Sequence, residues 1–275
     1  MTLDFFEQFR ENLESFPDRV AFQNLSDSGR ETFTYRQIAA ESGELGVLLA
    51  RSGIRPGEAV GILMESHPRW GIAFLAVQSA GAVVVPLDIL HDPETLAGLI
   101  DHAGCRFMIV SERTLPAWTE IQRLLPQPLP FLVAGREREA GAATLPLVKR
   151  SLDDVLMILY TSGTTGDPKG VVLTGRNVYQ NVVAAVKMIG PNSEDHFLQV
   201  LPMYHVLALV INCIIPLYLG ARGTFLQSLE AQRIMKIGRE GGGYVFNTGE
   251  MVPRDTPVEN MEAMLHAARE NARCG

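Results

Sequence analysis

The chain has 275 residues, of which 47% are hydrophobic and 20% charged; this ordinary globular usage excludes a disordered, collagen-like or coiled-coil chain. The formal net charge of −7 argues against nucleic-acid binding, because neutralising phosphates requires clustered Lys and Arg. The three cysteines (Cys105, Cys213 and Cys274) lie far apart without zinc-ligand spacing, so we expect reduced thiols in a reducing compartment.

Short apolar, β-branched segments alternate along the chain with longer amphipathic segments. Strands are expected at 59–64, 83–86, 106–110, 131–134, 155–160, 171–174, 197–201 and 223–226. Helices are expected at 34–52, 68–80, 93–102, 115–125, 175–189, 206–219 and 229–240. The alternation predicts an α/β fold, and the continuously apolar strands predict sheets covered by helices on both faces.

Several residues mark the ends of these elements. Thr34 and Thr174 stand where they can cap the helices that follow them, and Gly53 follows a periodic helix as a C-terminal stop. The segment 135–149 mixes charges with Gly and Ala, so it is expected to be an exposed linker. From Gly238 onward the core pattern stops, which predicts a partial domain over residues 1–237 and an off-pattern tail over 238–275.

Two segments of the sequence bear on secretion and membrane insertion, and neither has the required pattern. The acidic start of the chain lacks the cationic and then apolar pattern of a secretory signal. The apolar segment 207–219 contains Asn212 and Pro216 and falls short of the ~20 residues that cross a bilayer. We expect a cytoplasmic protein without a membrane span, with a membrane-peripheral location as the alternative.

One loop between two expected strands carries the residue types that bind anions. Its sequence is Thr161-Ser162-Gly163-Thr164-Thr165-Gly166-Asp167-Pro168-Lys169-Gly170. Glycines let backbone N–H groups approach an anion, hydroxyls donate hydrogen bonds, and the lysine brings a compact positive charge. The combination suits a polyphosphate, whereas the alternative is a polar hairpin; the loop lacks both the Gly-Lys-Ser/Thr of common NTPases and a dinucleotide GxGxxG.

The loop resembles the signature loop of the acyl-adenylate-forming (AMP-binding) superfamily, which includes acyl-CoA synthetases, peptide-synthetase adenylation domains and beetle luciferases. Four further segments are similar to the family in the same order: 16–21, 34–35, 80–88 and 201–205. The resemblance covers about residues 14–237 and is closest to an acyl-CoA synthetase; Gly175 stands where the family often has His. It implies multilayer sheets flanked by helices, as in the family's N-terminal domain.

The resemblance also implies a two-step reaction. A carboxylate attacks the α-phosphate of Mg-ATP, which gives an acyl-adenylate and pyrophosphate, and the thiol of coenzyme A then takes the acyl group. ATP, Mg²⁺ and coenzyme A are the implied cofactors. The implied contacts to the β- and γ-phosphates come from the loop, that is from Thr161, Ser162, Gly163, Thr164, Thr165, Gly166 and Lys169.

Two adjacent residues bear on the identity of the acid. Relatives that activate amino acids usually place an Asp after the aromatic residue of the acyl-pocket segment, where it pairs with the substrate ammonium group. Here His205 follows Tyr204, which favours acids without an amino group, fatty acids first and aryl acids second. Both residues are candidates for lining the acyl or nucleotide pocket, although His205 can also be a structural hydrogen-bonder and the apolar segment 206–219 ordinary core.

The remaining histidines have no metal-ligand spacing, and we expect surface or capping roles for His67, His91, His102, His196 and His266.

Family segments that would lie further along are not found in this sequence. They are a Mg-binding Glu, a ribose-binding Asp and a mobile C-terminal domain with the Lys that promotes adenylation. We therefore interpret the chain as a truncated N-terminal part without an assigned catalytic residue or metal ligand, inactive by itself. The alternatives are an acyl-AMP ligase that loads an acyl carrier protein, and a non-catalytic nucleotide-binding remnant.

Overall fold

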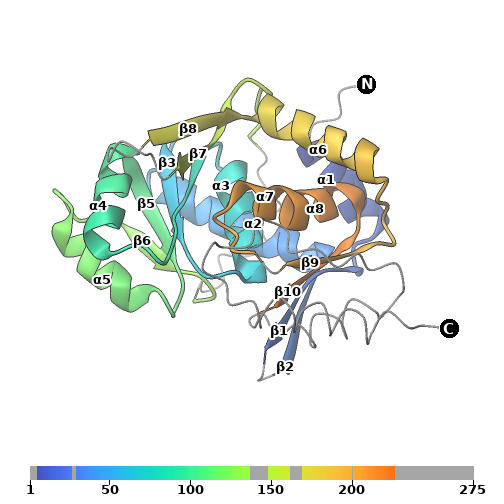
Figure 1. Cartoon of the computed structure of the whole chain (residues 1–275), viewed down its shortest axis with the longest axis horizontal. Coiled ribbons are helices and arrows are strands. Elements are labelled where there is room, and N and C mark those ends of the chain that lie inside the picture. The colour runs from blue at the N-terminus through green and yellow to red at the C-terminus, as the bar shows by residue number, and fades with distance from the viewer. Residues whose placement is uncertain (1–4, 27–28, 137–147, 162–168, 200, 227–275) are drawn as a thin grey trace, which may run out of the picture.

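The computed structural model describes residues 5–26, 29–136, 148–161, 169–199 and 201–226 (Figure 1). Its larger sheet has six strands in the order β6-β5-β3-β4-β7-β8. The bounds are β3 (Ala59–Leu63), β4 (Val83–Pro86), β5 (Cys105–Val110), β6 (Phe131–Val133), β7 (Val155–Thr161) and β8 (Lys169–Thr174). All neighbours pair in parallel except β7 and β8, which form an antiparallel hairpin.

The smaller sheet has four strands in the order β2-β1-β10-β9. The bounds are β1 (Val20–Ser26), β2 (Gly29–Thr34), β9 (His196–Gln199) and β10 (Arg222–Leu226). Strand β10 pairs in parallel with both β1 and β9, so segments about 200 residues apart in sequence lie side by side.

Helices cover these sheets in layers. Their bounds are α1 (Phe5–Ser15), α2 (Tyr35–Arg51), α3 (Pro68–Ser79), α4 (Pro93–His102), α5 (Leu115–Leu124), α6 (Gly175–Ile189), α7 (Val206–Leu209), the π-helical η1 (Val210–Ile214) and α8 (Ile215–Leu219). One core joins α4 and α5 to the six-stranded sheet through residues such as Leu96, Met108 and Trp118. A larger core joins α2 and α3 to both sheets, and Figure 1 shows these helices between them.

Helix α3 packs closely against the smaller sheet because it carries a glycine at the contact. A Cβ built on Gly71 would lie 2.8 Å from Cε2 of Phe22 in β1 and 3.1 Å from Sγ of Cys213 in η1. Almost every residue of α3 is buried. The helix is therefore the central layer that fixes the spacing of the two sheets.

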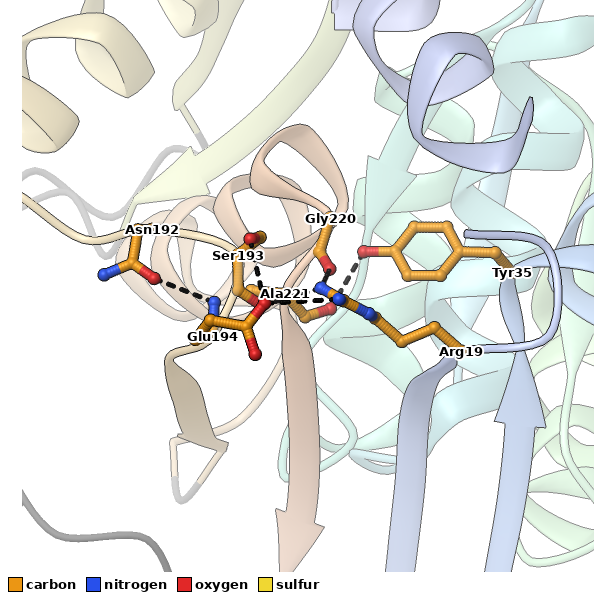
Figure 2. A network of polar contacts seen from close by, with 7 residues as sticks. All are labelled: Arg19, Tyr35, Asn192, Ser193, Glu194, Gly220 and Ala221. Carbon is orange, nitrogen blue, oxygen red and sulfur yellow. Dashed lines mark hydrogen bonds and ion pairs between the residues drawn. The ribbon is translucent and has the colours of Figure 1, made fainter. Parts of the chain in front are cut away.

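A polar network fastens the N-terminal segment to the last described helix and strand (Figure 2). The Arg19 guanidinium donates to the backbone oxygens of Ser193 and Gly220, each at 3.1 Å. The buried Tyr35 hydroxyl lies 2.8 Å from the carbonyl oxygen of Ala221. These contacts hold β1 and β10 in register at the start of both strands.

The predicted elements and caps agree with the structure over most of the described residues. Thr34 and Thr174 each form a capping box, with Gln37 and Asn177 respectively. Gly53 follows the end of α2 with φ of +90°, a conformation that glycine adopts without strain. The expected strands and helices recur with shifts of one or two residues at their ends.

Three features of the fold were not expected from the sequence. Helix α1 and the hairpin β1–β2 have no counterpart among the predicted elements; β2 is largely exposed and polar, so it carries no apolar signal. The expected helix 206–219 is divided by η1, which ends two residues before Pro216. The missing N–H of this proline interrupts the regular hydrogen-bond ladder.

The expected helix 229–240 and the tail 238–275 lie outside the described residues.

Within the described ranges, no helix is both long and apolar enough to cross a lipid bilayer.

Candidate functional site

The two stems of the anion-binding loop lie side by side. Thr161 ends β7 and pairs with Lys169, the first residue of β8, in the hairpin register. Lys169 is exposed. The stems therefore fix where the loop begins and ends, whereas Ser162, Gly163, Thr164, Thr165 and Gly166 lie outside the described residues.

The hairpin loop follows the carboxyl end of the six-stranded sheet. Strand β7 runs parallel to β4, and β4 to β3, so the loops after all three strands leave from the same edge. In open α/β sheets, ligands bind outside this edge. The segments after β3 and β4 carry Glu65, Ser66 and Asp88, so these polar residues follow strands that end at the same sheet edge as β7.

The second predicted segment, Leu201 to His205, leaves the carboxyl end of β9 in the smaller sheet. It is fastened to the larger sheet through Ser66, whose Oγ accepts a hydrogen bond from the Met203 amide at 3.0 Å. The same Oγ lies 3.4 Å from the Leu201 carbonyl oxygen and donates to it. The segment therefore bridges the carboxyl edges of both sheets.

Tyr204 and His205 lie at the turn that opens helix α7. Their ring centroids are 4.8 Å apart at 47°. Burial, and secondarily the Asp88 carboxylate after β4, raise the pKa of Tyr204 above its ordinary value, so the phenol is neutral. His205 is exposed and precedes α7 without a side-chain capping bond.

Apolar side chains are exposed at the start of α7 and near Asp88. Val206 is 40% exposed and Leu207 is 38% exposed, both in the first turn of α7. Leu90, two residues beyond Asp88, is 80% exposed. An apolar ligand next to His205 would cover surface that is otherwise in contact with water.

The structure thus joins Tyr204 and His205 to the loops after β3 and β4, which the sequence did not indicate. Ser66 and Asp88 are polar residues there that sequence reasoning missed, because a lone Ser or Asp more than 100 positions away from the segment gives no signal. Among the described residues, no hydrogen bond or ion pair joins Lys169 to Tyr204 or His205. The described stem of the loop and the Tyr204–His205 turn thus lie at the carboxyl edges of the larger and the smaller sheet respectively.

Three other histidines have structural partners. His67 caps α3 as expected: its Nδ1 accepts from the Arg69 amide at 3.2 Å, and burial lowers its pKa. His196 contacts the Thr224 hydroxyl, and burial lowers its pKa to about 4. His102 Nδ1 lies 2.7 Å from the hydroxyl of Tyr160, directly before the loop stem.

The described cysteines are buried and inert. Burial raises the pKa of Cys105 to about 12 and also raises that of Cys213, so neither thiol ionises at neutral pH. Cys274 lies outside the described residues.

Comparison with known proteins identifies the chain's family. The AMP-binding enzyme family model matches residues 9–241. Sulfoacetate–CoA ligase of Cupriavidus necator is 30% identical over 205 residues, which are 71% of this chain and 40% of that protein. Bacitracin synthase 3 of Bacillus licheniformis is 29% identical over 194 residues, 70% of this chain and 3% of that protein.

The solved structures agree with the sequence comparison. The N-terminal domain of FACL13 from Mycobacterium tuberculosis has a TM-score of 0.77 and 27% identity, and the match covers 87% of this chain and 61% of that one. The chain spans about two-fifths of the sulfoacetate–CoA ligase that it matches. The family match over residues 9–241 shows that this chain belongs to the AMP-binding enzyme family.

Proposed function

We propose that the chain serves in the ATP-dependent activation of a carboxylic acid to an acyl-adenylate, followed by transfer of the acyl group to the thiol of coenzyme A. The observation that carries the proposal is the Thr161–Lys169 pair, which closes a hydroxyl- and glycine-rich loop at the carboxyl edge of a mostly parallel sheet. Membership of the AMP-binding enzymes supports the same chemistry.

The loop would hold the triphosphate of ATP. The exposed Lys169 ammonium supplies one positive charge at the loop stem, and the hydroxyls of Thr161, Ser162, Thr164 and Thr165 would donate to the β- and γ-phosphate oxygens. Fixed donors of this kind stabilise negative charge as it develops on the leaving pyrophosphate. Mg²⁺, when bound, would neutralise further phosphate charge; no metal ligand is assigned to it in this chain.

The acid would lie beside His205 and the exposed apolar start of α7. An acid with an α-ammonium group would find His205, and not a carboxylate, directly after Tyr204, so the ammonium would lack a charge partner at this position. Val206 and Leu207 offer apolar contact to a hydrocarbon or aryl tail. We therefore infer a fatty or aryl acid, with the fatty acid favoured.

Two alternatives follow from particular observations. The similarity to bacitracin synthase 3 keeps open an acyl-AMP ligase that passes its product to an acyl carrier protein. A non-catalytic nucleotide-binding role for the domain 1–237 would need only the predicted phosphate loop that Thr161 and Lys169 close. Coenzyme A remains the proposed acceptor because a CoA ligase is among the similar proteins.

Paired acids that differ only in the amino group test the substrate proposal. Calorimetry on the purified chain, with a magnesium complex of a non-hydrolysable ATP analogue present, would compare 3-phenylpropionate with phenylalanine and 4-methylpentanoate with leucine. We expect the acid without the amino group to bind at least about tenfold more tightly in each pair. The His205→Asp variant should narrow that difference, and a wild-type preference for the amino acids would contradict the proposal.

A further inference from the structure

The backbone of the predicted acid-binding segment is held by two side chains that come from different sheets. Ser66 follows β3 of the six-stranded sheet and bonds both the Met203 amide and the Leu201 carbonyl. Gln199, the last residue of β9 in the four-stranded sheet, donates through Nε2 to the same Leu201 carbonyl. The Leu201 oxygen therefore accepts hydrogen bonds from side chains that follow or belong to strands of both sheets.

The Ser66 hydroxyl both donates and accepts a hydrogen bond within this segment. Its single hydroxyl proton goes to Leu201, and its oxygen accepts from Met203. Gln199 is 1% exposed, and its Oε1 has no partner in the described part of the chain. Gln199 thus anchors the segment from its own strand, and Ser66 is the contact that reaches it from the other sheet.

We propose that Ser66 is a positioning residue for the carboxylic-acid site, which sets the placement of Tyr204 and His205 through the backbone of Leu201–Met203. This inference rests on the proposed function. Ser66 lies three residues after the end of the fully buried strand β3, so it provides a rigid reference. Tyr204 follows Met203 directly, and His205 follows Tyr204. Displacements of about 1 Å at a binding site already change its performance strongly.

The geometry predicts a selective effect on one ligand. Ser66 contacts the backbone of the acid segment, whereas the phosphate loop is carried by the β7–β8 hairpin. Removal of the hydroxyl should therefore weaken acid binding and leave nucleotide binding almost unchanged. If the bond were purely structural, its loss would instead lower the stability of the chain and weaken the binding of acid and nucleotide to a similar extent.

The chain offers a matched control for this distinction. Ser42 in α2 is buried and donates from Oγ to the Ile72 carbonyl at 3.2 Å. It resembles Ser66 in chemistry and in joining two elements, but its bond joins α2 to α3. Ser42→Ala therefore reports on the loss of a serine-to-carbonyl bond outside the acid segment.

The experiment measures two quantities on wild type, Ser66→Ala, Ser66→Thr and Ser42→Ala. The first is the rate of amide hydrogen exchange at Met203. The internal reference is the Leu209 amide, which donates to the His205 oxygen at 3.0 Å. The second is the affinity for 3-phenylpropionate and for dodecanoate, compared with that for MgATP. Unfolding in urea confirms that each variant is folded under the conditions used.

We expect Ser66→Ala to speed exchange at Met203 about tenfold relative to Leu209, and to weaken acid binding about tenfold with MgATP affinity within about twofold of wild type. Ser66→Thr should restore the slow Met203 exchange and the acid affinity, and Ser42→Ala should change neither of these quantities. Unchanged Met203 exchange, or an equal loss of acid and MgATP affinity, would overturn the positioning role. If the wild-type chain bound neither acid although its Met203 amide was protected from exchange, the proposed function would be overturned, and with it the basis of the positioning role.

Discussion

The Tyr35→Phe substitution probes the contact that holds the N-terminal segment to the end of the smaller sheet. The Tyr35 side chain is fully buried, and its hydroxyl lies 2.8 Å from the Ala221 carbonyl oxygen and 3.0 Å from that of Pro216. The Pro216 oxygen also accepts from the Gly220 and Ala221 amides. Removing the hydroxyl therefore takes a donor chiefly from the Ala221 carbonyl (Figure 2). The ring and its packing are kept, which isolates the hydrogen bond.

Leaving a buried acceptor unpaired costs about 1–3 kcal/mol, and we expect a loss of about 1.5 kcal/mol in the free energy of unfolding. Urea denaturation should show a lower midpoint with an unchanged m value. The control is Arg36→Met, which removes an exposed ion pair to Asp18 at 3.2 Å and should cost less than about 0.5 kcal/mol. A Tyr35→Phe protein as stable as Arg36→Met would refute the reasoning.

Two other predictions concern the same core. The pKa of His196 is about 4 in the folded chain against about 6.5 when unfolded, so the unfolded state takes up the proton first; the stability due to its neutral form is complete above pH ~6.5 and is lost as pH falls toward ~4. Since His196 is partly exposed, we expect the free energy of unfolding to fall by about 1–2 kcal/mol. Urea unfolding at pH 7 and at pH 4.5 should show this loss in wild type and a smaller loss in His196→Asn. Gly71→Ala would place its Cβ 2.8 Å from Phe22 and should lower the free energy of unfolding by about 1–3 kcal/mol. Gly98→Ala, which has open space around its Cβ, should not lower it. Equal effects of the two substitutions in thermal unfolding would contradict the close packing of α3.

Local patterns predict most of the fold because they act over a few residues. The buried strand β4 and the helices α4 and α6 agree with their expected bounds, since continuous apolar residues, helical periodicity and a capping Thr are read directly from the sequence. The hairpin β1–β2 was missed because β2 is polar and exposed and is held by β1. Pairing of β1 with β10 joins residues about 200 positions apart, which no short pattern contains.

The candidate site was predictable to a lesser extent. The loop 161–169 and the pair Tyr204–His205 stand out by residue type and order. Ser66 and Asp88 do not, because each is an ordinary polar residue whose role depends on the folding of two sheets against α3. The family resemblance gave the order of the segments, whereas only the structure gives the bonds from Ser66 to Leu201 and Met203.

The central claim is that the Thr161–Lys169 loop holds the β- and γ-phosphates of ATP. Its most direct test is calorimetric titration of MgATP and of AMP into wild type, Lys169→Ala and the control Lys187→Ala, which removes an exposed lysine in the last turn of α6. We predict that Lys169→Ala weakens MgATP binding at least about tenfold and leaves AMP binding within about twofold of wild type, while Lys187→Ala changes neither. An equal loss of affinity for MgATP and AMP, or no loss for either, in folded Lys169→Ala protein would contradict the account.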